Sequence, residues 1–177
     1  MSRVARRSVA IAAGLTCLGA GAWLGWRQFA RPTVDQRALR ILEGLTLPDA
    51  QGNPYPLAAL TGKTVVLNFW ATWCPPCVEE MPELAELHNE IAPRNGTVIG
   101  IGIDSPANIR EFASKQRFPY PLLVGGMGGS ELSRLLGNPS GALPFTVVIS
   151  PRGHIAEQIL GRIKLPLLRK QVLAQLA

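Results

Sequence analysis

The chain has few residues that could hold a metal ion. Its 177 residues include three cysteines and two histidines, and the histidines, His88 and His154, stand far apart in the sequence. A protein zinc site usually takes four ligands, such as two Cys-x-x-Cys pairs or one pair with two neighbouring histidines. The sequence offers neither set, so we expect no metal site. It also lacks a glycine-rich phosphate-binding motif, so we expect no nucleotide cofactor.

Excess positive charge is scarce outside the first 37 residues. Residues 1–37 hold six arginines against one aspartate, whereas residues 38–177 hold twelve basic against eleven acidic residues. The net charge of +6 therefore belongs almost entirely to the N-terminal segment. A nucleic-acid-binding protein needs basic residues on its folded surface, where they displace counterions from the phosphates. We therefore expect no nucleic-acid partner.

The uncharged run over residues 8–26 is typical of a membrane-spanning helix. At about 1.5 Å per residue it would cover roughly 30 Å, the thickness of the hydrocarbon core. Trp23 and Trp26 lie at its far end, where indole rings favour the membrane interface. A cleaved signal peptide is the alternative, since Ala20-Gly21-Ala22 resembles a cleavage site. We expect residues 1–7 to lie in the cytoplasm and residues 8–26 to form a transmembrane anchor or signal segment. Whether this segment is retained or cleaved, the folded part would be exported.

The remainder is expected to form one folded domain over residues 41–177, after a linker or short juxtamembrane helix over 27–40. A domain of roughly 140 residues buries enough apolar surface to be stable without disulfides. Its first part is typical of a β-hairpin: residues 45–53 form a strand and a turn, and residues 55–57 return beside them.

Strands and helices then alternate along the chain. The β-branched and aromatic runs at 64–70 and 97–104 are typical of buried strands. Further extended segments are expected at 118–124, 145–150 and 155–160, and helices at 107–115, 131–136 and 165–176, with Ser105 as a cap and a mobile glycine-rich loop at 125–129. This order predicts an α/β fold with a mixed sheet.

The sequence Trp73-Cys74-Pro75-Pro76-Cys77 is the strongest chemical signal. It follows a buried strand and opens the next helix, where the helix dipole and unpaired N–H groups would favour a thiolate at Cys74. Pro76 fits the first helical turn, in which a missing N–H costs little. Thiolate is the attacking species in disulfide exchange, so Cys74 is the expected nucleophile and the more buried Cys77 the resolving thiol.

Two other uses of the cysteine pair fit less well. A structural disulfide between residues three apart closes too small a loop to stabilise the fold much. A metal site would need two further ligands, and the third cysteine, Cys17, lies inside the apolar run. Redox chemistry is the interpretation that the spacing favours.

The helix after the motif carries a carboxylate on its apolar side. Glu80, Leu84, Leu87 and Ile91 recur at helical spacing, beside an acidic stripe of Glu79, Glu83, Glu86 and Glu90. Glu80 should therefore face the core one turn after Cys77. Burial would raise its pKa, and it could exchange protons with the resolving thiol. The alternative is a glutamate at the stripe edge whose carboxylate reaches water.

The run VVLNFWATWCPPCVEEMP at residues 65–82 resembles the TlpA/ResA-like branch of the thioredoxin superfamily. The resemblance extends from about Leu45 to the C-terminus and implies a thioredoxin-like fold with an N-terminal hairpin extension. Thioredoxins carry an aspartate where this chain has Asn68; in this branch the acid at the Glu80 position takes over that role. Members are typically tethered to the cytoplasmic membrane with the catalytic domain on the periplasmic or outer side.

The resemblance also assigns Pro144 as a cis-proline opposite the cysteine pair. It would aim the backbone of Leu143 at an extended substrate peptide, and Trp73 would join them in substrate binding. On the residues alone, a trans proline opening a strand is equally open. Relatives often carry threonine after this proline, whereas this chain has Phe145, a difference at the groove that receives the substrate.

Together these features predict an extracytoplasmic dithiol reductase of protein disulfides that a membrane thiol-reducing donor re-reduces. The substrates that the resemblance implies include apocytochrome c and copper-site proteins. A disulfide-forming oxidase of the same fold is the alternative enzyme, and a copper chaperone that holds its metal between Cys74 and Cys77 is the alternative from another class.

Overall fold

A computed structural model describes residues 34–176, which form one compact unit. The predicted anchor at 8–26, Cys17 and the cytoplasmic segment at 1–7 lie outside the described residues. None of the helices within 34–176 is long and apolar enough to cross a membrane.

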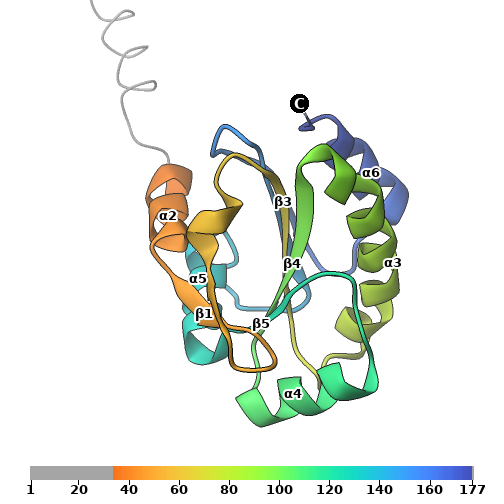
Figure 1. Ribbon diagram of the computed structural model, residues 1–177. Coiled ribbons are helices and arrows are strands. Elements are labelled where there is room, and N and C mark those ends of the chain that lie inside the picture. Colours follow the sequence, from red (N-terminus) through yellow and green to blue (C-terminus); the bar gives the residue numbers. More distant parts are fainter. Residues whose placement is uncertain (1–33, 177) are drawn as a thin grey trace, which may run out of the picture. The chain divides into compact units, whose positions relative to one another are not determined.

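A five-stranded mixed sheet forms the centre of the domain, in the order β5-β4-β3-β6-β7 (Figure 1). The central strand β3 (Thr64–Trp70) is buried along its whole length, as its apolar run predicts. On one side lie the parallel strands β4 (Gly96–Gly102) and β5 (Leu122–Val124); on the other lie the antiparallel strands β6 (Phe145–Ile149) and β7 (Ile155–Leu160). The predicted α/β fold with a mixed sheet is confirmed.

Helices cover both faces of this sheet, and each face has its own apolar core (Figure 1). On one face, α3 (Pro75–Ile91), α4 (Pro106–Lys115) and α6 (Leu165–Leu173) contribute to the core that contains Cys77. On the other face lie α2 (Val34–Glu43), α5 (Gly126–Leu135) and the 3-10 turn η1 (Leu57–Leu60). A second 3-10 turn, η2 (Ala92–Arg94), follows α3.

The N-terminal hairpin predicted at 45–57 is present as β1 (Thr46–Pro48) and β2 (Pro54–Pro56). Asp49 organises its turn, because Oδ1 accepts hydrogen bonds from the backbone N–H groups of Gln51 and Asn53, both at 2.8 Å. Although partial burial opposes it, these and related hydrogen bonds lower the pKa of Asp49. The hairpin joins the main sheet through Ala50, whose N–H donates to the carbonyl oxygen of Leu122 at 3.0 Å.

The domain begins earlier than the sequence predicts. Residues 34–40, assigned to a linker or short helix, form most of α2. This helix is part of the folded domain, since Ala38, Leu39 and Leu42 are buried in the core beside η1. Their spacing on one helical face is the signal that marks the domain boundary at Val34.

The prediction of a mobile loop at 125–129 is wrong. Residues 126–129 form the first turn of α5, and Gly125 and Gly129 let this helix approach strand β4 closely. A Cβ on Gly125 would lie 2.5 Å from Cγ2 of Ile101 and 3.0 Å from the Cα of Gly129. The helix ends at Leu135, one residue before the predicted end at Leu136, and Gly137 follows with a positive φ of 103°.

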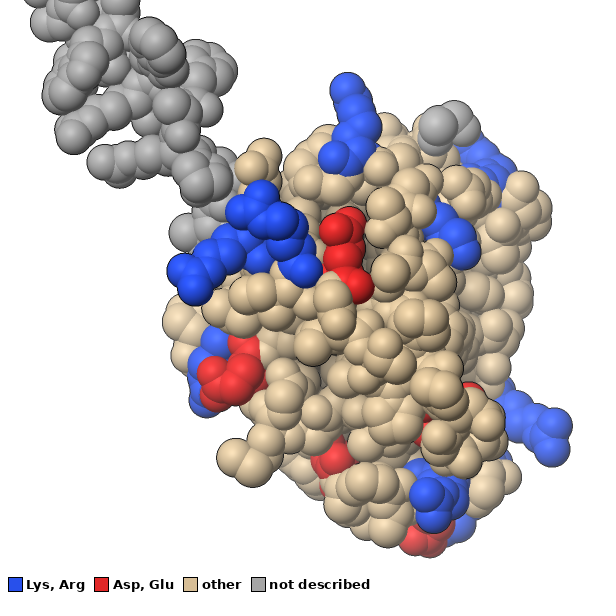
Figure 2. Space-filling model, turned by 60° about the vertical axis from the view of Figure 1, so that its left-hand side comes forward, with Lys and Arg blue, Asp and Glu red and all other residues tan. Residues whose placement is uncertain are grey.

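Basic and acidic side chains are interspersed with uncharged ones over the face that includes α2 (Figure 2). No continuous basic surface is visible on that face, in keeping with the near balance of charge in residues 38–177.

Candidate active site

Cys74 and Cys77 form a disulfide at the beginning of α3, with their Cα atoms 5.3 Å apart. Cys74 is the helix N-cap and retains 5% of its accessible surface, whereas Cys77 is completely buried. The neighbouring Trp73 is 65% exposed. Cys74 is thus slightly more accessible than Cys77, the order expected of an attacking and a resolving cysteine.

The first turn of α3 contains fewer free N–H groups than the sequence argument assumes. Pro75 and Pro76 have none, and the N–H groups of Cys77 and Val78 both donate to the carbonyl oxygen of Cys74, at 3.0 and 3.2 Å. The expected direct hydrogen bonds from unpaired N–H groups to the Cys74 sulfur are therefore not available here. The aligned peptide dipoles of a 17-residue helix remain as the feature that favours a thiolate.

Asp104 fixes the loop that leads from β3 into the motif. Its Oδ2 accepts hydrogen bonds from the hydroxyl of Thr72 and from the Thr72 N–H, the latter at 3.2 Å. Its Oδ1 accepts from the N–H of Ser105 and from the side-chain amide of Asn108. Burial opposes ionisation, but these bonds together lower the pKa of Asp104. Sequence reasoning missed this residue, although a carboxylate at the end of a buried strand next to the motif-bearing strand was a usable signal.

Glu80 is fully buried, as its helical stripe predicts. Its Oε1 accepts a hydrogen bond from Nδ2 of Asn68 at 2.8 Å, and its Oε2 accepts one from the backbone N–H of Ile163 at 2.9 Å. Burial raises the pKa of Glu80 to about 6, and the two hydrogen bonds and Arg162 limit that rise. A carboxyl group with this pKa changes its protonation near neutral pH, which suits proton exchange with a thiol.

Asn68 and Tyr120 are two further buried polar residues near Glu80. Asn68 also donates from Nδ2 to the hydroxyl of Thr146 at 3.0 Å, on the neighbouring strand β6. Within residues 34–176, Asn68 Oδ1, Trp70 Nε1 and the Tyr120 hydroxyl are buried without a hydrogen-bond partner. Burial, together with the nearby charge of Glu80, raises the pKa of Tyr120, so its hydroxyl stays protonated.

The Leu143–Pro144 peptide bond is cis in the structure. Phe145 pairs with Phe69 in the antiparallel register of β6 and β3, which places Pro144 at the end of the sheet from which the cysteine motif emerges. The carbonyl oxygen of Pro144 accepts a hydrogen bond from the N–H of Gly161 at 2.8 Å. The geometry thus brings Leu143 and Pro144 to the same end of the sheet as the cysteines, and their role in substrate binding stays a prediction.

The acidic stripe on α3 pairs with two arginines from the C-terminal part of the chain. Arg162 donates to Glu79 and Glu83, at 3.1 and 3.0 Å. Arg169, on α6, donates to Glu90 at 2.8 Å and to Glu86. The sequence analysis identified the acidic stripe but neither of its partners, because each lies about 80 residues away.

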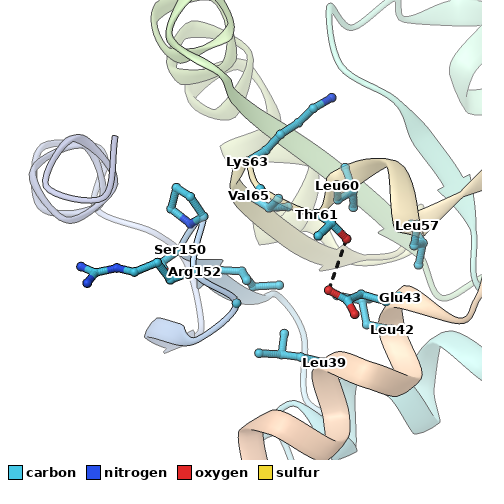
Figure 3. A pocket seen from close by; sticks show the side chains of 14 residues that line it. Leu39, Leu42, Glu43, Leu57, Leu60, Thr61, Lys63, Val65, Ser150 and Arg152 are labelled. Atoms are coloured by element: carbon cyan, nitrogen blue, oxygen red, sulfur yellow. Dashed lines mark hydrogen bonds between the residues drawn. The ribbon is translucent and has the colours of Figure 1, made fainter. Parts of the chain in front are cut away.

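A separate apolar pocket lies on the opposite face of the sheet from Cys77 (Figure 3). Leu39 and Leu42 of α2 face Leu57 and Leu60 of η1 across it, and Thr61 donates a hydrogen bond to Glu43 at its edge. The side chains there include no cysteine or histidine. Within residues 34–176, no three His, Cys, Asp or Glu side chains are grouped so that they could hold a metal.

Residues 40–158 match the AhpC/TSA family. The chain belongs to this family. Its sequence is also similar to the thiol-disulfide oxidoreductase ResA of Bacillus anthracis, with 30% identity over 115 residues. That match covers 64% of this chain and 64% of the relative, slightly less than two thirds of its length.

Other comparisons cover more of the domain. The thioredoxin-like protein YneN of Bacillus subtilis is 28% identical over 158 residues, which cover 84% of this chain and 88% of the relative. A crystal structure of a thioredoxin-family thiol:disulfide interchange protein from Chlorobium tepidum TLS superimposes with a TM-score of 0.65 at 28% identity. That superposition covers 75% of this chain and 93% of the other. The fold is therefore thioredoxin-like, as the resemblance predicts.

Proposed function

We propose that this protein is a thiol–disulfide oxidoreductase that reduces disulfides in other proteins. The observation that carries the proposal is the Cys74–Cys77 disulfide at the start of α3 with the buried carboxyl group of Glu80 one turn further along. The names of the relatives support the same class of chemistry.

In this reaction the reduced pair supplies two electrons. The Cys74 thiolate attacks one sulfur of the substrate disulfide, forms a mixed disulfide, and releases the other substrate sulfur as a thiolate that takes up a proton. The Cys77 thiolate then attacks the Cys74 sulfur and releases the second substrate thiol. The substrate ends as a dithiol and the protein as the Cys74–Cys77 disulfide.

Glu80 would accept the proton that Cys77 must lose before the second attack. Its carboxylate is buried beside the helix turn that carries Cys77, and its pKa of about 6 leaves it mostly ionised at neutral pH. Leu143, Pro144 and Trp73 would receive the extended chain that flanks the substrate cysteine. The exposed indole of Trp73 supplies apolar surface next to the attacking sulfur.

The proposal includes a location outside the cytoplasm, on an anchor at residues 8–26, and a membrane thiol-reducing donor that returns the pair to the dithiol form. The support is the uncharged run and its terminal tryptophans. Apocytochrome c and copper-site proteins of oxidases are the proposed substrates, from the family resemblance alone.

The reduction potential of the pair tests the direction of the reaction. Equilibration with redox buffers should give a potential of about −250 mV or lower for a reductase. A value of about −120 mV, near that of thioredoxin-fold oxidants, would favour the disulfide-forming oxidase instead.

Cysteine variants test the assignment of roles. Cys74→Ser should abolish disulfide reduction, and Cys77→Ser should retain the first attack and accumulate mixed disulfides with substrate. If Cys74→Ser trapped substrate and Cys77→Ser did not, the two roles would be reversed. If neither variant lost activity, the proposed chemistry would be wrong.

A further inference from the structure

The loop between β7 and α6 contacts both halves of the candidate active site. The N–H of Gly161 donates to the carbonyl oxygen of Pro144 at 2.8 Å, and the N–H of Ile163 donates to Oε2 of Glu80 at 2.9 Å. Between them, Arg162 extends its side chain to the outer side of α3. Three successive residues thus connect the cis-proline, the buried acid and the helix that carries the cysteines.

Arg162 holds α3 at two points on either side of Glu80. Its Nη1 lies 3.1 Å from Oε2 of Glu79, and its Nη2 lies 3.0 Å from Oε1 of Glu83. A planar guanidinium that bridges two carboxylates one helical turn apart fixes both the distance between the loop and the helix and the orientation of one relative to the other. A single exposed ion pair does not do this. The loop is therefore tied to the helix from outside by Arg162 and from inside by Ile163, which is itself buried.

We propose that Arg162 is a positioning residue for Glu80, which acts by holding the Gly161–Ile163 loop against α3 so that the Ile163 N–H stays on the buried carboxylate. The inference rests on the proposed function, in which Glu80 takes the proton of Cys77. Arg162 touches neither cysteine nor substrate in this scheme, and its effect reaches the thiols only through Glu80.

The charges around Glu80 allow the effect of Arg162 to be separated from its neighbours. From α3 itself, Glu83 raises the pKa of Glu80, and from the loop Arg162 lowers it. Tyr120, from the segment before β5, stays a neutral phenol, and Asn68 of β3 is uncharged. In the oxidised protein Cys77 does not titrate, so the carboxyl group of Glu80 can be followed alone.

Arg169 provides a matched control. It also bridges two glutamates of the same stripe one turn apart, Glu86 and Glu90, and it also comes from the C-terminal part of the chain. It differs in having no backbone link to Glu80. An effect that belongs to ion pairs on α3 in general should appear equally in Arg169→Gln and Arg162→Gln.

The experiment measures the titration of Glu80 in the full chain, oxidised, with carbon-13 in the glutamate carboxyl groups and Glu80→Gln to assign the signal. In Arg162→Gln we expect the midpoint to move to higher pH and the Ile163 amide to lose protection from hydrogen exchange. Arg169→Gln should leave both at their wild-type values, and Arg162→Lys, which keeps the charge but not the two-carboxylate bridge, should restore only part of the midpoint and only part of the amide protection.

The rate of disulfide reduction at pH 7 should fall about two- to fivefold in Arg162→Gln, the size expected for a partly exposed ion pair. Equal midpoints in Arg162→Gln and wild type, or equal shifts in Arg162→Gln and Arg169→Gln, would overturn the inference. The titration needs no substrate, so its failure leaves the proposed reductase activity standing. Failure of the reductase assay in the wild type would leave the titration result intact.

Discussion

Asn68 and Glu80 form a buried amide–carboxylate pair, with Nδ2 of the amide 2.8 Å from Oε1 of the acid. The strand supplies a neutral partner and the helix supplies the acid, the reverse of the thioredoxin arrangement that the family resemblance describes. An amide can serve either state of the acid: its NH₂ donates to a carboxylate, and after rotation its oxygen accepts from a carboxylic acid. Within the described residues Asn68 Oδ1 has no hydrogen-bond partner, so it is free to accept a hydrogen bond from the protonated acid.

Asn68→Asp should convert this pair into two carboxyl groups that share one proton. Two carboxylates at hydrogen-bond distance repel each other, so one of the two pKa values should rise well above that of Glu80 in the wild type. Above that value the charged pair should destabilise the fold by about 2–4 kcal/mol. Urea unfolding at pH 5 and pH 8 measures the effect.

The control for this substitution is Asn89→Asp, on the exposed side of the same helix as Glu80. It adds the same charge but should leave the dependence of the free energy of unfolding on pH as it is in the wild type. A loss of stability in Asn68→Asp that is equal at pH 5 and pH 8 would contradict the shared-proton explanation.

Glu80 should make the wild-type fold less stable as the pH rises from about 4.5 to about 6. Its pKa is raised in the folded state, so the folded protein binds the proton more tightly than the unfolded chain in that window. The stabilisation that comes from the protonated acid is present below pH 4.5 and lost above pH 6. A rise from 4.5 to about 6 corresponds to about 2 kcal/mol.

The difference in free energy of unfolding between Glu80→Gln and wild type isolates this contribution. It should increase in favour of the variant by about 2 kcal/mol between pH 4 and pH 7. Glu86→Gln, whose side chain is 62% exposed, should show no comparable trend. A flat difference for Glu80→Gln would mean that its pKa is the same in the folded and unfolded states.

The parts of the fold that sequence predicted best are those with a strong local pattern. The bounds of β3 match the apolar run from Thr64 to Trp70, and Ser105 caps α4 by accepting from the N–H of Asn108 at 3.1 Å. The burial of Glu80 followed from its helical stripe with Leu84, Leu87 and Ile91. Each of these depends on neighbours within a few turns or one strand.

The features that sequence missed depend on contacts between distant segments. Ile163 reaches Glu80 across 83 residues, and it does so with a backbone N–H, which carries no sequence signal. Residues 125–129, four of which are glycines, resemble a flexible loop in composition, whereas the close approach of α5 to Ile101 explains why Gly125 and Gly129 carry no side chain. The free N–H groups expected at Cys74 were lost because the two prolines leave the first turn with few donors.

Trp73→Ala should weaken the binding of protein substrates without weakening the fold. The indole is 65% exposed next to Cys74, so its removal opens no cavity in the core. We expect KM for a protein disulfide to rise about five- to thirtyfold, the range for an aromatic side chain central to an interface, with Tm unchanged. Reaction with a small disulfide should change little. Met127→Ala, which removes a 90% exposed side chain of α5, is the control and should leave both reactions unaltered.

Glu80→Gln should also change how thiol reactivity depends on pH. In the reduced wild type, the charge that Glu80 gains near pH 6 raises the cost of forming a thiolate at the neighbouring Cys77, so the two titrations are coupled. The alkylation rate should therefore follow two steps with pH in the wild type and a single step, at lower pH, in the variant.

Disulfide exchange should respond in the opposite direction. Without a carboxylate to take the Cys77 proton, release of the mixed disulfide should slow by about 100-fold, at the lower end of what a general base contributes. Faster alkylation combined with slower exchange separates a proton-transfer role from a purely structural one, because a loosened fold would alter both rates together. Glu86→Gln should reproduce the wild-type values of both rates. If alkylation and exchange in Glu80→Gln also matched the wild type at every pH, Glu80 would be a buried bystander and the proton of Cys77 would leave by another route.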